Sequence, residues 1–262
     1  MTLQALRDRI GGLERVVVAF SGGVDSALLA RVSHEVLGDR SVAVTAVSGS
    51  LAPSERDDCR RLAERWGMRW LEVGTDELAR ADYVRNDIDR CYHCKSELMD
   101  RLQPLADAER AVVTLGVNLD DLHDHRPGQR AARERGAVFP LVEAGFTKAM
   151  VREAARELGL DVWDKPAAAC LASRVPYGTP VTLGTLTAVA RAEQALKALG
   201  FGQVRVRHYG DLARLELDGE VLAEAVEQRK AVVEAVKEAG YRYVTLDLEG
   251  FRSGNLNEGV VH

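Results

Sequence analysis

The sequence predicts an α/β protein, with a doubly wound parallel sheet over residues 1–175 and a smaller C-terminal α+β domain over residues 176–262. Three observations lead to this prediction. Apolar runs of strand length alternate with segments of helical periodicity. The first run, Val16–Phe20, is apolar throughout, which is typical of a strand covered on both faces. A loop-like, proline-containing stretch at residues 164–180 then precedes a change of pattern.

In the first domain a lead-in helix precedes four strands, and a polar, partly helical insertion separates the third strand from the fourth. Strands are expected at residues 16–20, 42–47, 69–73 and 111–115, and helices at 24–37, 53–66 and 147–158. In the second domain we expect helices at 183–199 and 220–239 and strands at 203–208, 213–217 and 243–248. The turn Tyr209-Gly210-Asp211 predicts a hairpin between the first two of these strands.

Composition limits the class of protein. The 262 residues are 46% hydrophobic, enough for a substantial core, and their net charge of −5 argues against a broad nucleic-acid surface. No apolar stretch is long enough to span a bilayer, and the first residues lack the apolar core of a signal peptide. We therefore expect a cytoplasmic protein without membrane contact, whose four cysteines do not form structural disulfides.

A glycine loop joins the first strand to the following helix, with the sequence Ser21-Gly22-Gly23-Val24-Asp25-Ser26. Glycines permit a tight turn, and the free N–H groups and dipole of the helix that follows favour phosphate. The loop has neither the lysine of a Walker loop nor the third glycine of a dinucleotide fingerprint. It resembles the SGGxDS loop of the ATP pyrophosphatases, so we expect Ser21, Gly22, Gly23, Asp25 and Ser26 to bind ATP. The alternative is a glycine turn that binds nothing.

The ends of two other strands carry residues suited to the same site. Ligands bind at the carboxyl ends of parallel strands, and Ser48 and Gly116 follow two of them. We expect both to lie at the ATP site. The segment 116–121 adds an amide and two carboxylates that could position ATP or Mg²⁺, unless it is only a polar loop. The neighbouring His123, Asp124 and His125 are more typical of a solvated loop than of a metal site.

The cysteines suggest a metal cluster. Cys91 and Cys94 are three residues apart on an expected helix, so both can face one metal. With Cys170 as a third thiolate, one iron of a 4Fe–4S cluster would lack a protein ligand and could bind sulfide. The alternative, equally supported by the sequence, is a pair of helix residues that bind no metal. Cys59 stands alone among charged residues and is expected to be structural.

Cys170 also suggests nucleophilic chemistry. It stands in a loop of small residues with Lys165 and Arg174 nearby, and cationic neighbours favour the thiolate. Such a thiolate could attack an adenylated carboxylate and form a thioester. A buried structural cysteine is the alternative.

Two arginines of the second domain suggest an anion site. Arg205 and Arg207 alternate along one strand and share a face, which suits a phosphate or a carboxylate. Arg214 and Glu216 alternate in the same way on the partner strand. A cross-strand ladder of salt bridges is the alternative.

Taken together, these motifs resemble the LarE family, ATP-dependent sulfur transferases that act in nickel-pincer nucleotide biosynthesis for lactate racemase. The resemblance covers nearly the whole chain. Its marks are the Ser21–Ser26 loop, residues 90–95 (RCYHCK), 126–128 (RPG), 147–148 (TK), 165–166 (KP) and 170–178 (CLASRVPYG). The chain departs from the family pattern at Leu119, Leu122 and His125 and over residues 138–141.

The resemblance implies a mechanism. ATP·Mg²⁺ adenylates the carboxylates of pyridinium biscarboxylic acid mononucleotide, and sulfur then replaces AMP to give thiocarboxylates. Asp25, Ser26 and Cys170 would be catalytic, and Arg174, Arg205 and Arg207 would bind the substrate. The sulfur would come through a 4Fe–4S cluster on Cys91, Cys94 and Cys170, supplied by a sulfide donor, or from Cys170 itself. The resemblance also implies a homo-oligomer of six chains.

Three other functions fit parts of the sequence. A tRNA thiolase of the ATP pyrophosphatase type could hold a cluster on the same cysteines, but it needs a basic surface for tRNA. A non-catalytic ATP or AMP sensor would release no pyrophosphate. An amide-forming synthetase would need an ammonia source and would not need Cys170.

Overall fold

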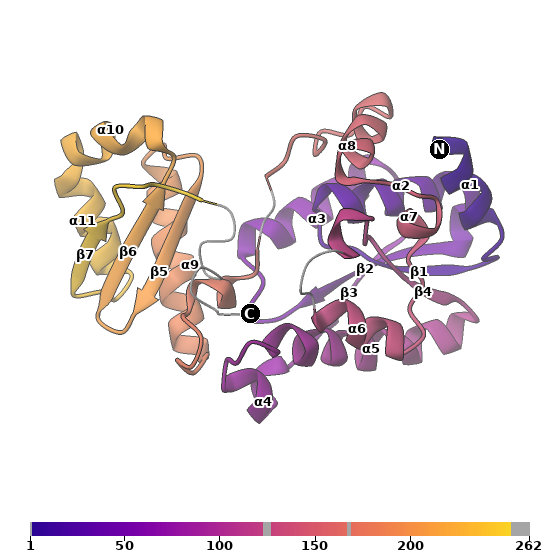
Figure 1. Ribbon diagram of the computed structural model, residues 1–262, viewed down its shortest axis with the longest axis horizontal. Helices are drawn as coiled ribbons and strands as arrows, with labels where there is room; N and C mark the ends of the chain where they lie inside the picture. Colours follow the sequence, from indigo (N-terminus) through magenta and orange to yellow (C-terminus); the bar gives the residue numbers. More distant parts are fainter. Residues whose placement is uncertain (1, 123–126, 167–168, 253–262) are drawn as a thin grey trace. The chain divides into compact units, whose positions relative to one another are not determined.

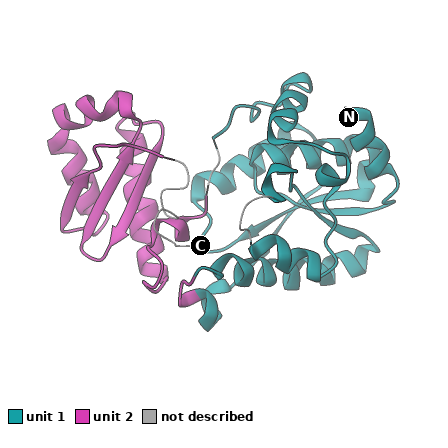
Figure 2. Cartoon of the chain, viewed as in Figure 1, with its two compact units in different colours: residues 1–83, 88–168 teal, residues 84–87, 169–262 magenta. Residues whose placement is uncertain are grey.

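The chain forms two compact units, which Figure 2 distinguishes by colour. The computed structural model describes residues 2–122, 127–166 and 169–252. Unit 1 comprises Met1–Tyr83 and Ile88–Ala168, and unit 2 comprises Val84–Asp87 and Ala169–His262. The chain passes into unit 2 for the second time within the loop-like stretch 164–180.

Unit 1 is built on a parallel sheet of four strands, as the sequence predicts (Figure 1). The strands are β1 (Val16–Ala19), β2 (Ser41–Val47), β3 (Trp70–Gly74) and β4 (Val112–Leu115). Their spatial order is β3-β2-β1-β4, with Val16 paired to Ser41 on one side and to Val112 on the other. The order therefore reverses at β1, and ligands of doubly wound sheets bind at such a switch point.

Helices cover both faces of this sheet (Figure 1). Val16 and Val18 pack on one side against α1 (Leu3–Gly11), α2 (Val24–Leu37), α3 (Pro53–Arg65), α7 (Pro140–Glu143) and α8 (Lys148–Glu157). Val17 packs on the other side against α5 (Arg90–Glu109) and α6 (Pro127–Glu134). Burial on both faces explains why the first strand is apolar throughout.

The segment between β3 and β4 is more helical than the sequence suggested. It contains the short helix α4 (Ala81–Val84) and the 20-residue helix α5, which continues past Pro104 to Glu109. Helices α6 and α7 were not predicted either. Both are short, and each begins at a proline that satisfies the geometry of a first helical turn.

Unit 2 contains a three-stranded sheet and helices. The predicted hairpin is confirmed, because β5 (Val204–Tyr209) and β6 (Leu212–Leu217) pair antiparallel, while β7 (Tyr243–Leu246) runs parallel to β6. Helix α9 (Leu183–Ala198) matches its prediction. The single helix expected at residues 220–239 is wrong: α10 (Leu222–Glu227) and α11 (Arg229–Glu238) are separated at Gln228, whose ψ of 14° interrupts the helix.

Residues 84–87 belong to unit 2 through Asn86. This side chain is fully buried, and its backbone has a left-handed φ of 58°. Its carbonyl accepts a hydrogen bond from Gly178 N at 3.0 Å. Its Nδ2 donates to three backbone carbonyls, those of Val175 (3.3 Å), Pro176 (2.7 Å) and Thr179 (2.8 Å). A short segment from the first third of the chain thus fixes the loop after Cys170.

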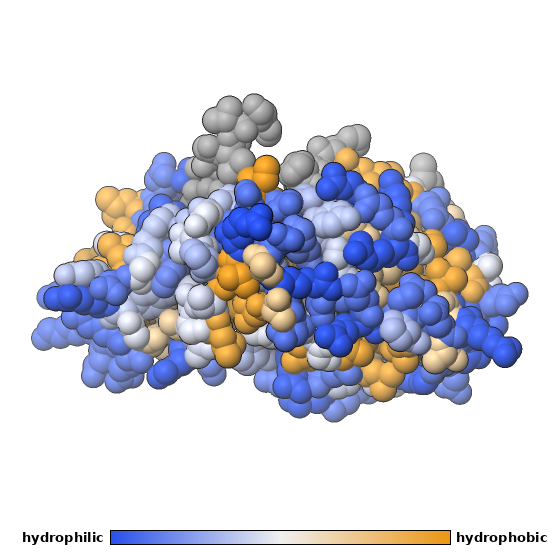
Figure 3. All heavy atoms as spheres, turned by 90° about the horizontal axis from the view of Figure 1, so that it is seen from below, coloured by the Kyte–Doolittle hydropathy of each residue, from blue (hydrophilic) through white to orange (hydrophobic). Residues whose placement is uncertain are grey.

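The surface in Figure 3 is mainly hydrophilic, with smaller hydrophobic areas between hydrophilic side chains. Across the part of the chain that the structure describes, no helix is long and apolar enough to cross a membrane.

Gly116 permits close packing between the end of β4 and the start of α2. A Cβ at this position would lie 2.6 Å from Ser26 N and 2.8 Å from the carbonyl carbon of Asp25. Both are backbone atoms and cannot rotate away. We expect Gly116→Ala to lower the free energy of unfolding by about 1–3 kcal/mol, the usual cost of overpacking, as measured by denaturant titration.

Gly74→Ala is the matched control, because this glycine ends β3 and no atom lies within 4 Å of a Cβ built on it. It should change the free energy of unfolding by less than about 0.5 kcal/mol. Equal stability of the two variants would contradict the packing argument.

Candidate active site

The loop Ser21–Ser26 joins β1 to α2 and is shaped by its glycines. Gly22 has a left-handed φ of 71°, and a Cβ there would lie 3.0 Å from the Sγ of the buried Cys59. Gly23 is the N-cap of α2 and has an extended backbone. A side chain at Gly22 would be strained as well as crowded, so the loop needs glycine at this position.

Ser21 and Ser26 stabilise the loop by hydrogen bonds within it. Ser26 Oγ donates to the carbonyl of Gly23 at 3.0 Å and accepts from Ser21 N at 3.2 Å. The two hydroxyl oxygens lie 3.1 Å apart. No side chain caps α2, so its first N–H groups and its positive dipole end are available to an anion.

Asp25 links three segments of unit 1 that are far apart in the sequence. Its Oδ1 accepts a hydrogen bond from Asn118 Nδ2 at 2.9 Å, and its Oδ2 forms an ion pair with Lys148 Nζ. Asn118 is buried just after β4, and Lys148 begins α8. The sequence predicts no role for Lys148 beyond its place in the family motif Thr147-Lys148. The capping residue Thr147, whose Oγ1 accepts from Met150 N, is the local signal that places this lysine.

The loop after β4 holds its carboxylates by local hydrogen bonds. Asn118 Oδ1 accepts from the backbone N of Asp120 (3.0 Å) and Asp121 (3.3 Å), and Asp121 Oδ2 accepts from Asn118 N (3.1 Å). Asp120 Oδ2 accepts from Lys148 N at 2.7 Å. No three His, Cys, Asp or Glu side chains among the described residues form a group that could hold a metal ion. His123, Asp124, His125 and Arg126 lie outside those residues.

Ser48 and Gly116 follow β2 and β4, as predicted, and both contact other residues of unit 1. Ser48 Oγ donates to the buried Glu77 at 2.5 Å and accepts from Ser50 N at 3.1 Å. Gly116 packs against the backbone of Ser26, as described above.

Lys165 connects the glycine loop to α3. Its Nζ donates to Glu55 (2.8 Å) and Asp58 (2.9 Å) on α3, and to the carbonyl of Gly22 (3.4 Å). Burial lowers the pKa of this lysine, but the hydrogen bonds to the two carboxylates outweigh burial and raise the pKa overall. Lys165 therefore stays protonated, and its ammonium group points to α3 and the glycine loop.

The four cysteines differ in exposure, and none is in a disulfide. Cys91 is exposed and Cys94 half-buried, both near the start of α5 in unit 1, whereas Cys170 is exposed in unit 2. Cys59 lies in the core, as predicted, and burial raises its pKa to about 11. It is a neutral thiol at physiological pH.

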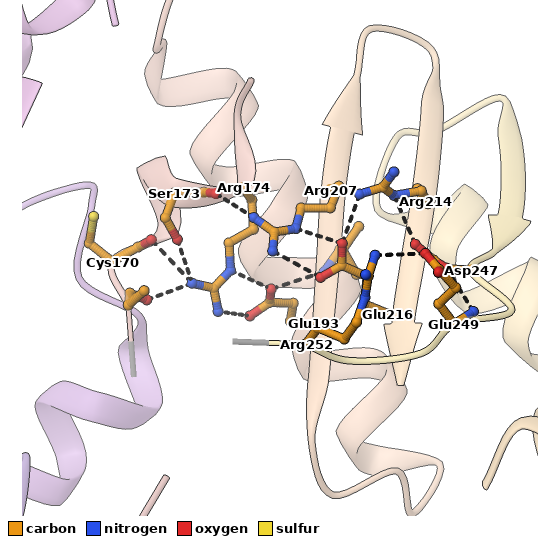
Figure 4. A network of polar contacts seen from close by, with 12 residues as sticks. Cys170, Ser173, Arg174, Glu193, Arg207, Arg214, Glu216, Asp247, Glu249 and Arg252 are labelled. Atoms are coloured by element: carbon orange, nitrogen blue, oxygen red, sulfur yellow. Dashed lines mark hydrogen bonds and ion pairs between the residues drawn. The ribbon is translucent and has the colours of Figure 1, made fainter. Parts of the chain in front are cut away.

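The arginines of unit 2 lie in a network of ion pairs (Figure 4). Arg207 is 2% exposed and forms two hydrogen bonds to Glu216, at 3.0 and 2.9 Å, and Arg214 donates to the same carboxylate at 2.9 Å. The cross-strand ladder that we considered as an alternative is therefore present. Arg174, also predicted to bind substrate, is buried and paired with Glu193.

Arg205 has a different environment from the other two. Its guanidinium lies 4.6 Å from the centre of the Phe251 ring. Burial, followed by the positive charges of Arg174 and Arg207, lowers its pKa to about 10. An anion beside this guanidinium would relieve that repulsion.

Comparisons with known proteins place the chain among ATP-using enzymes. Residues 4–94 match the NAD synthase family. An uncharacterized protein of Synechocystis sp. is 48% identical over 97% of this chain and 96% of its own length. The pyridinium-3,5-bisthiocarboxylic acid mononucleotide synthase of Lactiplantibacillus plantarum is 40% identical over 97% of this chain and 91% of its own. A GMP synthase of Chlamydia muridarum is 36% identical over 29% of the chain.

The match to the NAD synthase family covers the segment that contains the glycine loop, β1 and α2, whereas the synthase of L. plantarum matches across both units. The chain therefore belongs to the LarE family, the family of pyridinium-3,5-bisthiocarboxylic acid mononucleotide synthase.

Proposed function

We propose that this protein is an ATP-dependent sulfur transferase that converts the carboxylates of pyridinium biscarboxylic acid mononucleotide to thiocarboxylates. The name of its L. plantarum relative supports the product, since it describes that enzyme as a synthase of a bisthiocarboxylic acid mononucleotide. The observation that carries the proposal is the uncapped N-terminus of α2 beside the pair formed by Asp25 and Lys148. This arrangement suits a nucleotide whose pyrophosphate must leave.

In the first step, a carboxylate oxygen of the substrate attacks the α-phosphorus of ATP. The bond from this phosphorus to the bridging oxygen breaks, and pyrophosphate leaves with both electrons, giving an acyl adenylate. The N–H groups at the start of α2 stabilise the developing negative charge. Lys148 moves its ammonium from Asp25 to the phosphates. Asp25 and Asp120 would then hold Mg²⁺, which neutralises the charge of the leaving pyrophosphate.

In the second step, sulfur replaces AMP at the acyl carbon. Cys91, Cys94 and Cys170 fit a 4Fe–4S cluster in chemistry, because all three are thiols with access to solvent. The cluster would supply an iron that binds an exogenous sulfide. Cys91 and Cys94 belong to unit 1, and Cys170 belongs to unit 2.

The second source of sulfur is Cys170 itself. Its thiolate attacks the acyl carbon, AMP leaves, and a thioester forms. Loss of the Cα proton then breaks the Cβ–S bond, which yields the thiocarboxylate and dehydroalanine without an oxidant or a reductant.

We further propose, from the family, a cytoplasmic homo-oligomer of six chains that receives its sulfide from a donor.

Removing the ammonium group of Lys148 should impair the first step. We expect Lys148→Met to lower kcat/KM for ATP about 10²- to 10³-fold, the usual cost of losing one group that stabilises transition-state charge. The measurement is the rate of substrate-dependent pyrophosphate release. Lys197→Met, an equal change of charge at an exposed position of α9, is the control and should leave this rate unchanged. An unimpaired Lys148→Met enzyme would exclude Lys148 from adenylation.

The source of sulfur can be tested by metal analysis after purification without oxygen. We expect iron, sulfide and a visible chromophore in the wild-type protein. Cys91→Ala, Cys94→Ala and Cys170→Ala should each lose them, whereas Cys59→Ala should keep them because that thiol is buried and neutral. A colourless, iron-free protein whose Cys170 loses hydrogen sulfide during turnover, seen by mass spectrometry, would instead identify Cys170 as the donor.

A further inference from the structure

We propose that a buried network of arginine and glutamate side chains positions the loop that carries Cys170 for sulfur transfer. The positioning network consists of Arg174, Glu193, Arg207 and Glu216, all in unit 2. The proposal rests on the proposed function, because it takes Cys170 as a residue that handles sulfur. It assigns two of the predicted substrate-binding arginines a different task.

The guanidinium of Arg174 is occupied by groups of the protein itself. Its Nη1 donates to the carbonyls of Ala169 (2.5 Å) and Cys170 (3.1 Å) and lies 3.1 Å from Ser173 Oγ. Its Nε and Nη2 donate to the two carboxylate oxygens of Glu193, at 2.8 and 3.1 Å. All three nitrogens are thus engaged, and the residue is only 7% exposed. Arg174 therefore holds the loop and has little capacity left for a substrate.

Arg207 holds the other end of the same loop. Its Nη1 donates to the carbonyl of Ser173 at 2.8 Å, while its Nε and Nη2 bind Glu216. Cys170 is the residue before the short 3₁₀ helix Leu171–Arg174. Arg174 and Arg207 therefore donate hydrogen bonds to carbonyl groups at both ends of this turn, at residues 169, 170 and 173.

The two glutamates fix the arginines in place. Glu193 on α9 also accepts a hydrogen bond from Val206 N of β5 at 3.1 Å, so its carboxylate is tied to the sheet. Glu216 is fully buried and shared between Arg207 and Arg214. Arg214 Nε lies 3.5 Å from a carboxylate oxygen of Asp247. Each of the two arginines of the positioning network is therefore held in one orientation.

Such a network is costly to bury. Taking charged groups out of water carries a desolvation penalty that their mutual attraction only partly offsets, so buried ion pairs add little to stability. Two adjacent pairs that converge on one turn are better explained by the geometry that they impose. Figure 4 shows the result: the backbone carbonyls of the loop point to the arginines, and the sulfur of Cys170 points away from them.

A fixed loop matters for the chemistry at Cys170. Reacting atoms must be held at a short separation and in line, and a displacement of about 1 Å can lower a rate by about 10²-fold. An exposed thiol on an unrestrained loop would sample many positions. The positioning network removes this freedom without touching the sulfur.

The test uses the full-length protein and three variants. Glu216→Gln keeps the shape of the side chain but removes the charge that orients Arg207, and Arg174→Lys keeps the charge but cannot make the fork to Glu193 and the loop. Glu220→Gln, an exposed glutamate of unit 2, is the control. Pyrophosphate release and thiocarboxylate formation are measured separately, together with amide hydrogen exchange of a peptide covering residues 169–175.

We expect Glu216→Gln and Arg174→Lys to form at least 10-fold less thiocarboxylate per pyrophosphate released, with the KM for the nucleotide substrate changed less than about twofold. Exchange at residues 169–175 should rise at least 10-fold in both variants, while the rest of unit 2 stays protected and the control matches the wild type. Protection of the rest of unit 2 shows that the variants are folded.

Three outcomes would overturn the proposal. Unchanged exchange at residues 169–175 would mean that the network does not hold the loop. Faster exchange with undiminished thiocarboxylate formation would mean that its role is only structural. A rise in KM with a parallel loss of pyrophosphate release would mean that Arg174 binds the substrate instead. If the wild-type protein forms no thiocarboxylate, the proposed function fails, and the exchange experiment still decides whether the network restrains the loop.

Discussion

The uncapped start of α2 is the constraint on which the rest of unit 1 depends. The first N–H groups of a helix have no partner within the helix, and here Gly23 has no side chain to cap them. Surrounding residues keep this end in place instead. Gly116 lets the end of β4 pack closely against the backbone of the loop, and Cys59 packs against Gly22. Lys165 donates a hydrogen bond to the carbonyl of Gly22. A helix end of this kind suits an anion.

Much of the fold could be predicted from local pattern. Both faces of the sheet are covered, so its strands must be apolar on both sides. Apolar runs such as Val16–Phe20 and residues 42–47 are therefore visible as strands in the sequence. The break between α10 and α11 could not be predicted, since residues 221–238 contain neither glycine nor proline. The place of Asn86 in unit 2 was equally hidden, because its three acceptors lie about 90 positions further along the chain.

The sequence indicated candidate site residues but not the partners of their side chains. The place of the glycine loop between a strand and a helix follows from its motif and context, but the choice of partner for a charged side chain depends on tertiary contacts. Arg207 pairs with Glu216 across the hairpin, which the alternation of charges allowed but did not demand. Lys148 and Asp25 are more than 100 residues apart, so no local pattern could join them.

The discontinuity of unit 2 has a consequence for how the protein can be divided. A fragment that begins at residue 169 would lack Asn86, and the carbonyls of Val175, Pro176 and Thr179 would lose their common donor just beyond the cysteine loop. Chimaeras between members of this family must therefore exchange residues 84–87 together with the C-terminal part. Each unit is compact by itself, but the chain enters unit 2 twice.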